Sequence, residues 1–68
     1  MIGEEIRKAR QNKGMTQEKL AFEAGISRNY VSLLELNQKS PTVDVWLRIC
    51  DALDVSAAGM IKRVQRKR

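Results

Sequence analysis

The sequence predicts an all-α protein, a compact domain of five helices. Apolar residues recur three and four positions apart over most of the 68 residues, which is the spacing of one face of an α-helix. No segment alternates apolar and polar residues over a useful length, so no β-strand is expected. Three serine or threonine residues stand inside hydrophobic staples, which mark where helices begin. A chain of this length has room for one small core.

The first expected helix covers about residues 2–12 and ends at Gly14, a residue type that commonly follows a helix. Its apolar residues fall on one helical face: Ile2, Ile6 and Ala9. Glu4 and Glu5 lie near its start, where the helix dipole favours acidic side chains. The spacing and the end signals together predict an amphipathic helix.

Two short helices follow within residues 16–35. Thr16 can cap the first of them and Ser27 the second, and Gly25 between them is expected to turn the chain with a positive φ. The residues expected to face the core are Leu20, Ala21, Ala24, Ile26, Val31 and Leu34. Two helices packed at a steep angle through a short turn form a helix-turn-helix. A plain helical hairpin inside a small bundle is the alternative.

The last two expected helices begin at residues 41–42 and at about Ala57, the latter capped by Ser56. The apolar stripe of the fourth helix consists of Val43, Trp46, Ile49, Cys50 and Leu53. The fifth helix presents Met60, Ile61 and Val64 and runs into the tail. Cys50 is interpreted as a small core residue, and Trp46 as a core residue rather than a platform for base stacking.

The net charge of +5 comes from the C-terminal end of the chain. Five of the 13 basic residues lie in residues 62–68, and the remaining basic residues balance the 8 acidic ones. We therefore expect a helix-turn-helix domain over residues 1–61 and a basic tail over residues 62–68 that either continues the fifth helix or is disordered. Bulk charge alone is a weak argument for nucleic-acid binding, because a basic tail is more often a solvated end.

The composition disfavours several classes of function. The chain has no histidine and Cys50 is its only cysteine, so neither the usual zinc ligand sets nor an intramolecular disulfide is expected. A glycine-rich phosphate loop is also missing, and no catalytic residue, metal or cofactor is predicted. No apolar run reaches membrane-spanning length, and the N-terminus lacks a signal-peptide core. We expect a cytoplasmic protein that is not an enzyme.

An outward face of the third helix carries residue types that can read DNA. With Val31 and Leu34 directed inward, a rotation of about 100° per residue turns a second set of residues outward. That set is Asn29, Ser32, Leu33 and Leu36, with Arg28 at the flank. Arginine can bond to guanine, asparagine to adenine, and an apolar side chain can touch a thymine methyl group. The pattern predicts base contacts, and ordinary solvent-facing residues are the alternative.

The segment MTQEKLAFEAGISRNYVSLLE resembles the core signature of the lambda-repressor-like, Cro-type helix-turn-helix family, also called the XRE family. The segment KSPTVDVWLRICDALDVS is similar to the fourth helix of that family and the lead into its fifth. The resemblance covers about residues 4–61, with both parts in the expected order. It implies a five-helix DNA-binding domain whose third helix enters the major groove and presents Arg28, Asn29, Ser32 and Leu33 to the bases.

Contacts to the DNA backbone are expected around the third helix. The candidates are Arg10, Gln17, Ser27, Tyr30, Asn37, Lys39 and Ser40. For Tyr30, packing in the core is the larger part expected, with the hydroxyl group left to reach a phosphate. Asn37 stands where the family often has glycine, and asparagine also tolerates a left-handed helix end. Arg10 and Glu35 match a pair common in the family and are expected to support each other, with an ordinary surface ion pair as the alternative.

The resemblance implies a sequence-specific, double-stranded DNA-binding transcriptional regulator. It includes Cro-like repressors, controller proteins of restriction–modification systems and antitoxins, and does not decide among them. The fourth and fifth helices carry more apolar residues than one stripe needs, which predicts a homodimer on an inverted-repeat operator. The expected interface residues are Leu47, Ile61 and Val64. The alternative is an antitoxin-like or adaptor protein whose main partner is another protein, such as a toxin or RNA polymerase.

Overall fold

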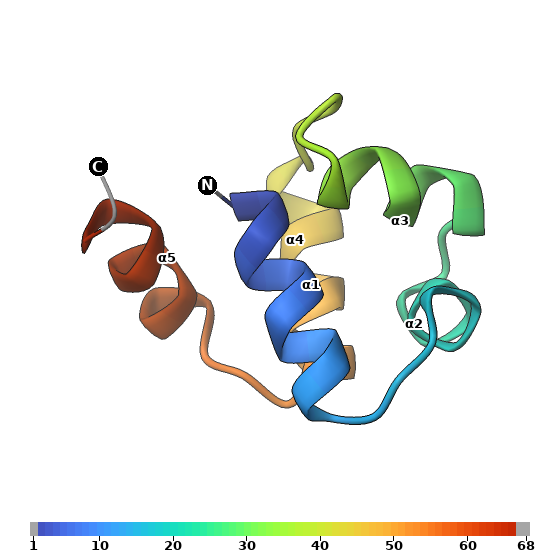
Figure 1. Ribbon diagram of the computed structural model, residues 1–68, viewed down its shortest axis with the longest axis horizontal. Helices are drawn as coiled ribbons and strands as arrows, with labels where there is room; N and C mark the ends of the chain where they lie inside the picture. Colours follow the sequence, from blue (N-terminus) through green and yellow to red (C-terminus); the bar gives the residue numbers. More distant parts are fainter. Residues whose placement is uncertain (1, 67–68) are drawn as a thin grey trace.

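Residues 2–66 form five α-helices in the computed structural model, which describes these residues and the side chains of residues 2–65. The helices are α1 (Ile2–Asn12), α2 (Gln17–Ala24), α3 (Arg28–Glu35), α4 (Val43–Leu53) and α5 (Ala57–Arg66). In Figure 1, α1 lies at the centre, with α2 and α3 on one side, α5 on the other and α4 behind. The predicted all-α class is confirmed. Residues 62–66 continue the fifth helix, and Met1, Lys67 and Arg68 lie outside the described residues.

Side-chain oxygens cap the starts of α2 to α5. The caps of α2, α3 and α5 are the predicted Thr16, Ser27 and Ser56, and Thr42 caps α4. The hydroxyl oxygens of Thr16, Ser27 and Thr42 accept hydrogen bonds from backbone N–H groups three residues later, at 3.0, 3.0 and 3.2 Å. Ser56 accepts in the same way from the N–H of Gly59 at 3.1 Å. Each cap satisfies a backbone donor that has no partner inside its own helix, and losing such a cap costs about 1 kcal/mol.

The turn between α2 and α3 depends on a residue in the left-handed region. Gly25 has a φ of 70° and a ψ of 34°, which confirms the predicted positive φ. The N–H of Ile26 returns to the carbonyl oxygen of Ala21 at 2.9 Å and closes the end of α2. Asn37, with a φ of 59°, and Asp54, with a φ of 56°, follow α3 and α4 in the same region. Asparagine and aspartate tolerate this region better than most residues.

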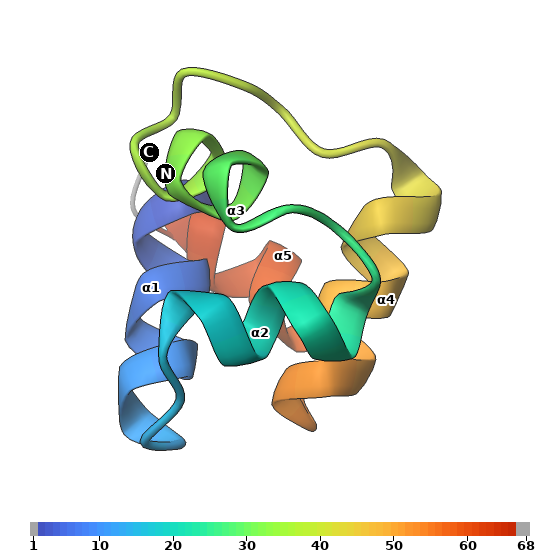
Figure 2. The same cartoon turned by 90° about the vertical axis from the view of Figure 1, so that its right-hand side faces the viewer.

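The steep crossing of α2 and α3 confirms the helix-turn-helix. Figure 2 shows α3 nearly end-on above α2, which runs across the view. The buried apolar residues are Ile6, Ala9, Leu20, Ala21, Ala24, Val31, Leu34, Ile49, Cys50, Leu53 and Met60. Trp46 packs on this core and donates its Nε1–H to the sulfur of Cys50, so both were interpreted correctly. Burial raises the pKa of the Cys50 thiol, which therefore stays protonated at neutral pH.

The prediction that Val43 belongs to the core stripe of α4 is wrong. Val43 is 76% exposed, and Leu47, one turn later on the same side, is 51% exposed. The buried stripe centres on Ile49, Cys50 and Leu53. At about 100° per residue, Val43 lies well to one side of that centre. The helix therefore carries an exposed apolar strip, Val43 and Leu47, beside its buried stripe.

The backbone at the start of α1 packs directly against the backbone at the end of α3 (Figure 1). A Cβ atom added at Gly3 would lie 2.4 Å from the carbonyl oxygen of Leu34 and 2.6 Å from that of Glu35. Side chains do not approach backbone oxygens so closely, so only glycine lets the two helices meet here. The sequence carries a weak sign of this contact, because glycine lowers the helix propensity of a segment that otherwise favours a helix.

Replacing Gly3 with alanine is expected to destabilise the fold, although alanine favours helices. Overpacking costs about 1–3 kcal/mol, which outweighs the gain of about 1 kcal/mol from helix propensity. The matched control is Gly59→Ala in α5, where the added Cβ would meet Ser56 atoms at an ordinary 3.6 Å. Urea unfolding should show a lower free energy of unfolding for Gly3→Ala and a higher one for Gly59→Ala. Wild-type stability in Gly3→Ala would contradict the close packing of α1 on α3.

Candidate nucleic-acid interface

Glu35, the last residue of α3, is a buried carboxylate that pairs with Arg10 of α1. Arg10 Nε donates to Glu35 Oε2 at 2.7 Å, and Arg10 Nη2 donates to Glu35 Oε1 at 3.1 Å. The side chain of Glu35 is 3% exposed and that of Arg10 is 12% exposed. The two residues form the expected pair, and the alternative of an ordinary surface ion pair is wrong. Two charge-assisted bonds fix both the distance and the plane of the guanidinium group.

The same pair binds two further groups. Gln17, the first residue of α2, donates from Nε2 to Glu35 Oε1 at 3.1 Å. Arg10 Nη1 donates to the backbone carbonyl oxygen of Met15 at 2.8 Å, in the turn before α2. This Glu35 cluster, defined as Arg10, Met15, Gln17 and Glu35, joins the ends of α1 and α3 to the start of α2. Gln17 keeps one amide N–H and its carbonyl oxygen for other partners.

The expected base contacts lie along one side of α3 but differ in exposure. Arg28 and Asn29, in the first turn, are exposed, whereas Ser32 and Leu33 are only partly exposed. Ser32 and Leu33 therefore face outward less fully than the sequence predicts. Ser32 lines a shallow hollow beside the start of α2, together with Arg28 and Asn29. At Leu33 the following loop folds back, because the N–H of Gln38 donates to the Leu33 carbonyl oxygen at 2.9 Å.

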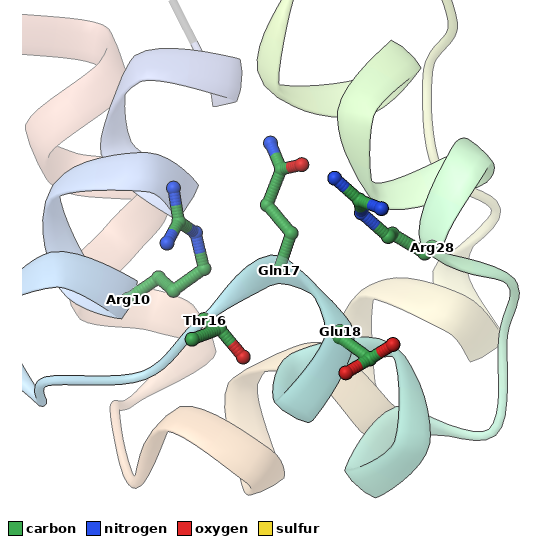
Figure 3. Close-up of a pocket in the computed structure, with 5 residues that line it drawn as sticks. All are labelled: Arg10, Thr16, Gln17, Glu18 and Arg28. Atoms are coloured by element: carbon green, nitrogen blue, oxygen red, sulfur yellow. The ribbon is translucent and has the colours of Figure 1, made fainter.

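A second hollow lies between the starts of α2 and α3 (Figure 3). It is lined by Arg10, Thr16, Gln17, Glu18 and Arg28. Its volume of about 420 Å³ is typical of small-molecule pockets. All of its lining residues are polar or charged, whereas such pockets are lined mainly by apolar side chains. Figure 3 shows the guanidinium groups of Arg10 and Arg28 on either side of Gln17. A hollow that combines an exposed arginine with the start of a helix suits an anionic group such as a phosphate.

The remaining candidates for backbone contacts surround this face. Four of them are exposed: Ser27, Asn37, Lys39 and Ser40. The hydroxyl oxygen of Ser27 already accepts a hydrogen bond from the Tyr30 N–H, and Tyr30 is half-buried against the core. Asn37 is exposed, but its Oδ1 accepts a hydrogen bond from the Gly3 N–H at 3.0 Å. The side chains of Ser27 and Asn37 thus already have partners within the protein.

Glu18 and Arg48 belong to this region without having been predicted. Glu18 adds a carboxylate to the hollow beside Arg28, and an acid in a first helical turn is too common to signal a function. Arg48 of α4 donates to the carbonyl oxygen of Ala24 at 3.5 Å, at the turn after α2. Arg48 also pairs with Asp44 and holds the pKa of that carboxyl below its usual range. The four-residue spacing of acid and base is the sequence signal for this pair.

Other kinds of site find no support in the described part of the chain. Within residues 2–66, no three Asp, Glu or Cys side chains gather as a metal ion would require. None of the helices described here is both long enough and apolar enough to cross a bilayer. The polar surface of α2 and α3 is therefore the strongest candidate for a binding site.

Comparison with known proteins places this geometry among DNA-binding regulators. The protein family described as helix-turn-helix matches residues 6–60 of the chain. Over 61 residues the chain is 33% identical to the uncharacterized HTH-type transcriptional regulator y4dJ of Sinorhizobium fredii, covering 90% of this chain and 79% of that protein. Over 57 residues it is 37% identical to the HTH-type transcriptional regulator SinR of Bacillus subtilis, covering 82% of this chain and 51% of SinR. The chain thus spans about half the length of SinR.

Solved structures share the arrangement of helices. The restriction-modification controller protein C.AhdI from Aeromonas hydrophila matches with a TM-score of 0.84 at 34% identity, over 87% of this chain and 89% of that one. SinR, a master regulator for biofilm formation, matches in its complex with DNA with a TM-score of 0.84 at 32% identity, over 90% of this chain and 98% of that one. Both confirm the predicted five-helix architecture of the lambda-repressor-like type.

Removing one partner of the Arg10–Glu35 pair is expected to destabilise the fold strongly. Glu35→Gln leaves a largely buried guanidinium group without its counter-charge, which costs about 3–5 kcal/mol. Arg10→Met leaves the buried carboxylate with the Gln17 amide but without a counter-charge. The double variant should cost clearly less than the two single costs added together. The matched control is the exposed Lys19–Glu23 pair at 3.3 Å, whose coupling should stay below about 0.5 kcal/mol. Urea unfolding of the wild type, the single variants and the double variant gives the coupling energy of each pair. Additive costs at Arg10 and Glu35 would contradict their buried pairing.

Proposed function

Since this chain belongs to the helix-turn-helix family of DNA-binding transcription regulators, which are not enzymes, we propose that it is a sequence-specific regulator that binds double-stranded DNA. It acts as a homodimer on an inverted-repeat operator, and occupancy of the operator blocks or recruits RNA polymerase. One observation carries the proposal. Arg28 and Asn29 are exposed at the start of α3, while the Glu35 cluster holds the other end of that helix.

Arg28 and Asn29 are the main base-reading residues in this proposal. The arginine fork matches the O6 and N7 acceptors of guanine, and the asparagine amide matches N6 and N7 of adenine. Both residues lie in the first turn of α3, and the start of the second helix of a helix-turn-helix is the part that meets the bases. Ser32 and Leu33 take a smaller share of the base contacts, because both are partly covered.

Phosphates are proposed to bind on both sides of α3. On one side, the remaining N–H groups of Arg10 and Gln17 serve the hollow at the start of α2. On the other side, Lys39 and Ser40 are exposed in the loop that follows α3. Ser27 and the hydroxyl group of Tyr30, which lie between these two places in the chain, are also proposed to contact phosphates. Such contacts set the register of the protein on the duplex and the salt dependence of binding, whereas the base contacts set the sequence.

A homodimer is proposed because α4 and α5 keep apolar surface that the core does not use. Leu47 is 51% exposed and Ile61 is 42% exposed, and Val64 is half-buried. The exposed Val43 extends the apolar surface at Leu47 by one turn. Burial of this surface in a twofold interface stabilises a small domain and sets the spacing of the two α3 helices. That spacing has to be about 34 Å, for half-sites about ten base pairs apart.

Leu36 favours a second candidate function, that of an antitoxin-like or adaptor protein. This leucine is 59% exposed directly after α3, where a toxin or RNA polymerase could contact it. Selection of binding sites from a random duplex pool separates the two functions. Enrichment of an inverted repeat supports the DNA-reading function. A pool without enrichment, together with a protein partner that is lost on Leu36→Ser, supports the second candidate.

Replacing Arg28 with alanine is expected to weaken binding to the preferred duplex by about 1–3 kcal/mol and to relax the preference at one base pair. Lys39→Ala is the comparison, because loss of a phosphate contact should weaken all duplexes alike and lower the slope of log affinity against log salt by about one. Fluorescence anisotropy titrations of preferred and scrambled duplexes at several salt concentrations measure both effects. An unchanged specificity ratio in Arg28→Ala would mean that α3 is not the reading helix.

A polar residue at Ile61 is expected to weaken the dimer. Ile61→Gln should lower the affinity for the full palindrome much more than the affinity for a single half-site, because only the palindrome requires two protomers. Phe22→Gln is the control, since Phe22 is 80% exposed but lies outside the proposed interface. Sedimentation velocity at micromolar concentration tests the premise. A wild-type monomer that binds one half-site as tightly as the palindrome would end the homodimer proposal.

A further inference from the structure

The first turn of α1 obtains a hydrogen-bond acceptor from a distant part of the chain. The first N–H groups of a helix have no partner within it, and a Ser, Thr, Asp or Asn side chain just before the helix usually supplies one. The residue before α1 is a methionine, whose side chain has no oxygen. The Gly3 N–H instead donates to Asn37 Oδ1 at 3.0 Å, across 34 positions of sequence. Asn37 does for α1 what Thr16 does for α2.

Asn37 is rigidly joined to the end of α3. Its backbone has a φ of 59°, and its N–H donates to the carbonyl oxygen of Leu34 at 3.1 Å. Glycine would adopt this conformation at least as easily, but it has no side-chain acceptor. Asparagine tolerates the left-handed region and still offers an oxygen. The contact with Gly3 therefore explains why asparagine, rather than glycine, suits this position.

Gly3 and Asn37 hold the backbones of α1 and α3 together. A Cβ atom at Gly3 would lie 2.4 Å from the Leu34 carbonyl oxygen and 2.8 Å from Asn37 Oδ1. Arg10, near the other end of α1, makes a second attachment to α3 through the Glu35 carboxylate. The burial of Val31 and Leu34 in the core limits how far α3 can move. The two attachments, made from separated points of α1 to the end of α3, restrict its remaining freedom to tilt.

We propose that Asn37 is a positioning residue for the DNA-reading helix: its side-chain oxygen, bound by the Gly3 N–H, sets the tilt of α3. This role uses the side-chain oxygen and is distinct from the predicted contact between Asn37 and a phosphate. The inference rests on the proposed function, in which α3 reads bases.

The length of α3 makes its tilt important at the bases. The helix has 8 residues and rises about 1.5 Å per residue, so a tilt of about 5° at its end moves Arg28 by about 1 Å. Hydrogen bonds to base edges tolerate shifts of only a few tenths of an ångström. Contacts from flexible side chains to phosphates adapt to such shifts and carry no sequence information. Loss of the Asn37 contact should therefore reduce specificity more than overall affinity.

Asn37→Gly is the test variant, because glycine keeps the left-handed turn and removes only the acceptor. Its affinity is measured for the duplex preferred by the wild type and for a scrambled duplex, at one salt concentration. The specificity ratio is expected to fall at least about fivefold, since base contacts are weakened and phosphate contacts are not. In the free protein, amide hydrogen exchange at Gly3, followed by NMR, should become at least about tenfold faster.

Asn37→Asp is the matched control, because aspartate tolerates the same conformation and restores the acceptor while adding a negative charge. It should keep the Gly3 amide protected and weaken binding to both duplexes by the same factor, which leaves the specificity ratio unchanged. Equal weakening of both duplexes by Asn37→Gly would identify a phosphate contact and overturn the proposal, as would binding like that of the wild type. A wild-type protein that prefers no sequence would instead overturn the proposed function, and this outcome is seen before any variant is made.

Discussion

Burial of the Glu35 carboxylate limits where α1, α2 and α3 can lie. A carboxylate removed from water is costly unless charge-assisted hydrogen bonds replace its hydration. Here Arg10 supplies two such bonds from α1, and Gln17 supplies another from the first residue of α2. Because the three side chains come from three helices, the carboxylate is satisfied only in one arrangement of those helices. The angle of the helix-turn-helix relative to α1 follows from this requirement.

The same arrangement leaves the start of α3 available for binding. The end of α3 is held by Glu35 and by the backbone contact with Gly3, so the first turn needs no further support from its own side chains. Arg28 and Asn29 can therefore remain exposed on a rigid element. The backbone of residues on such an element loses little conformational freedom on binding, which favours specificity. Glu18 in the adjoining hollow limits how strongly that surface attracts phosphates in general.

Most of the local structure could be predicted from the sequence, because it depends on residues only a few positions apart. The caps at Thr16 and Ser27, the left-handed Gly25 and the inward phase of Val31 and Leu34 are all properties of short segments. The same phase places Arg28 and Asn29 outward, so the centre of the candidate site was also predictable. The pairing of Arg10 with Glu35 was expected from resemblance, since 25 positions separate the two residues and no local rule joins them.

The sequence by itself thus determined the helices, their ends and the residues that face outward at the start of α3. Only the tertiary structure decided how deeply the Arg10–Glu35 pair is buried, how far Leu33 is covered and that Val43 is exposed. It also decided that the Gly3 N–H binds Asn37 across two helices. Burial and long-range hydrogen bonds depend on distances between segments that are remote in the chain, and helix propensity, periodicity and capping report only on near neighbours. The helices follow from local chemistry, whereas their placement relative to one another follows from contacts such as those of α1 with the end of α3.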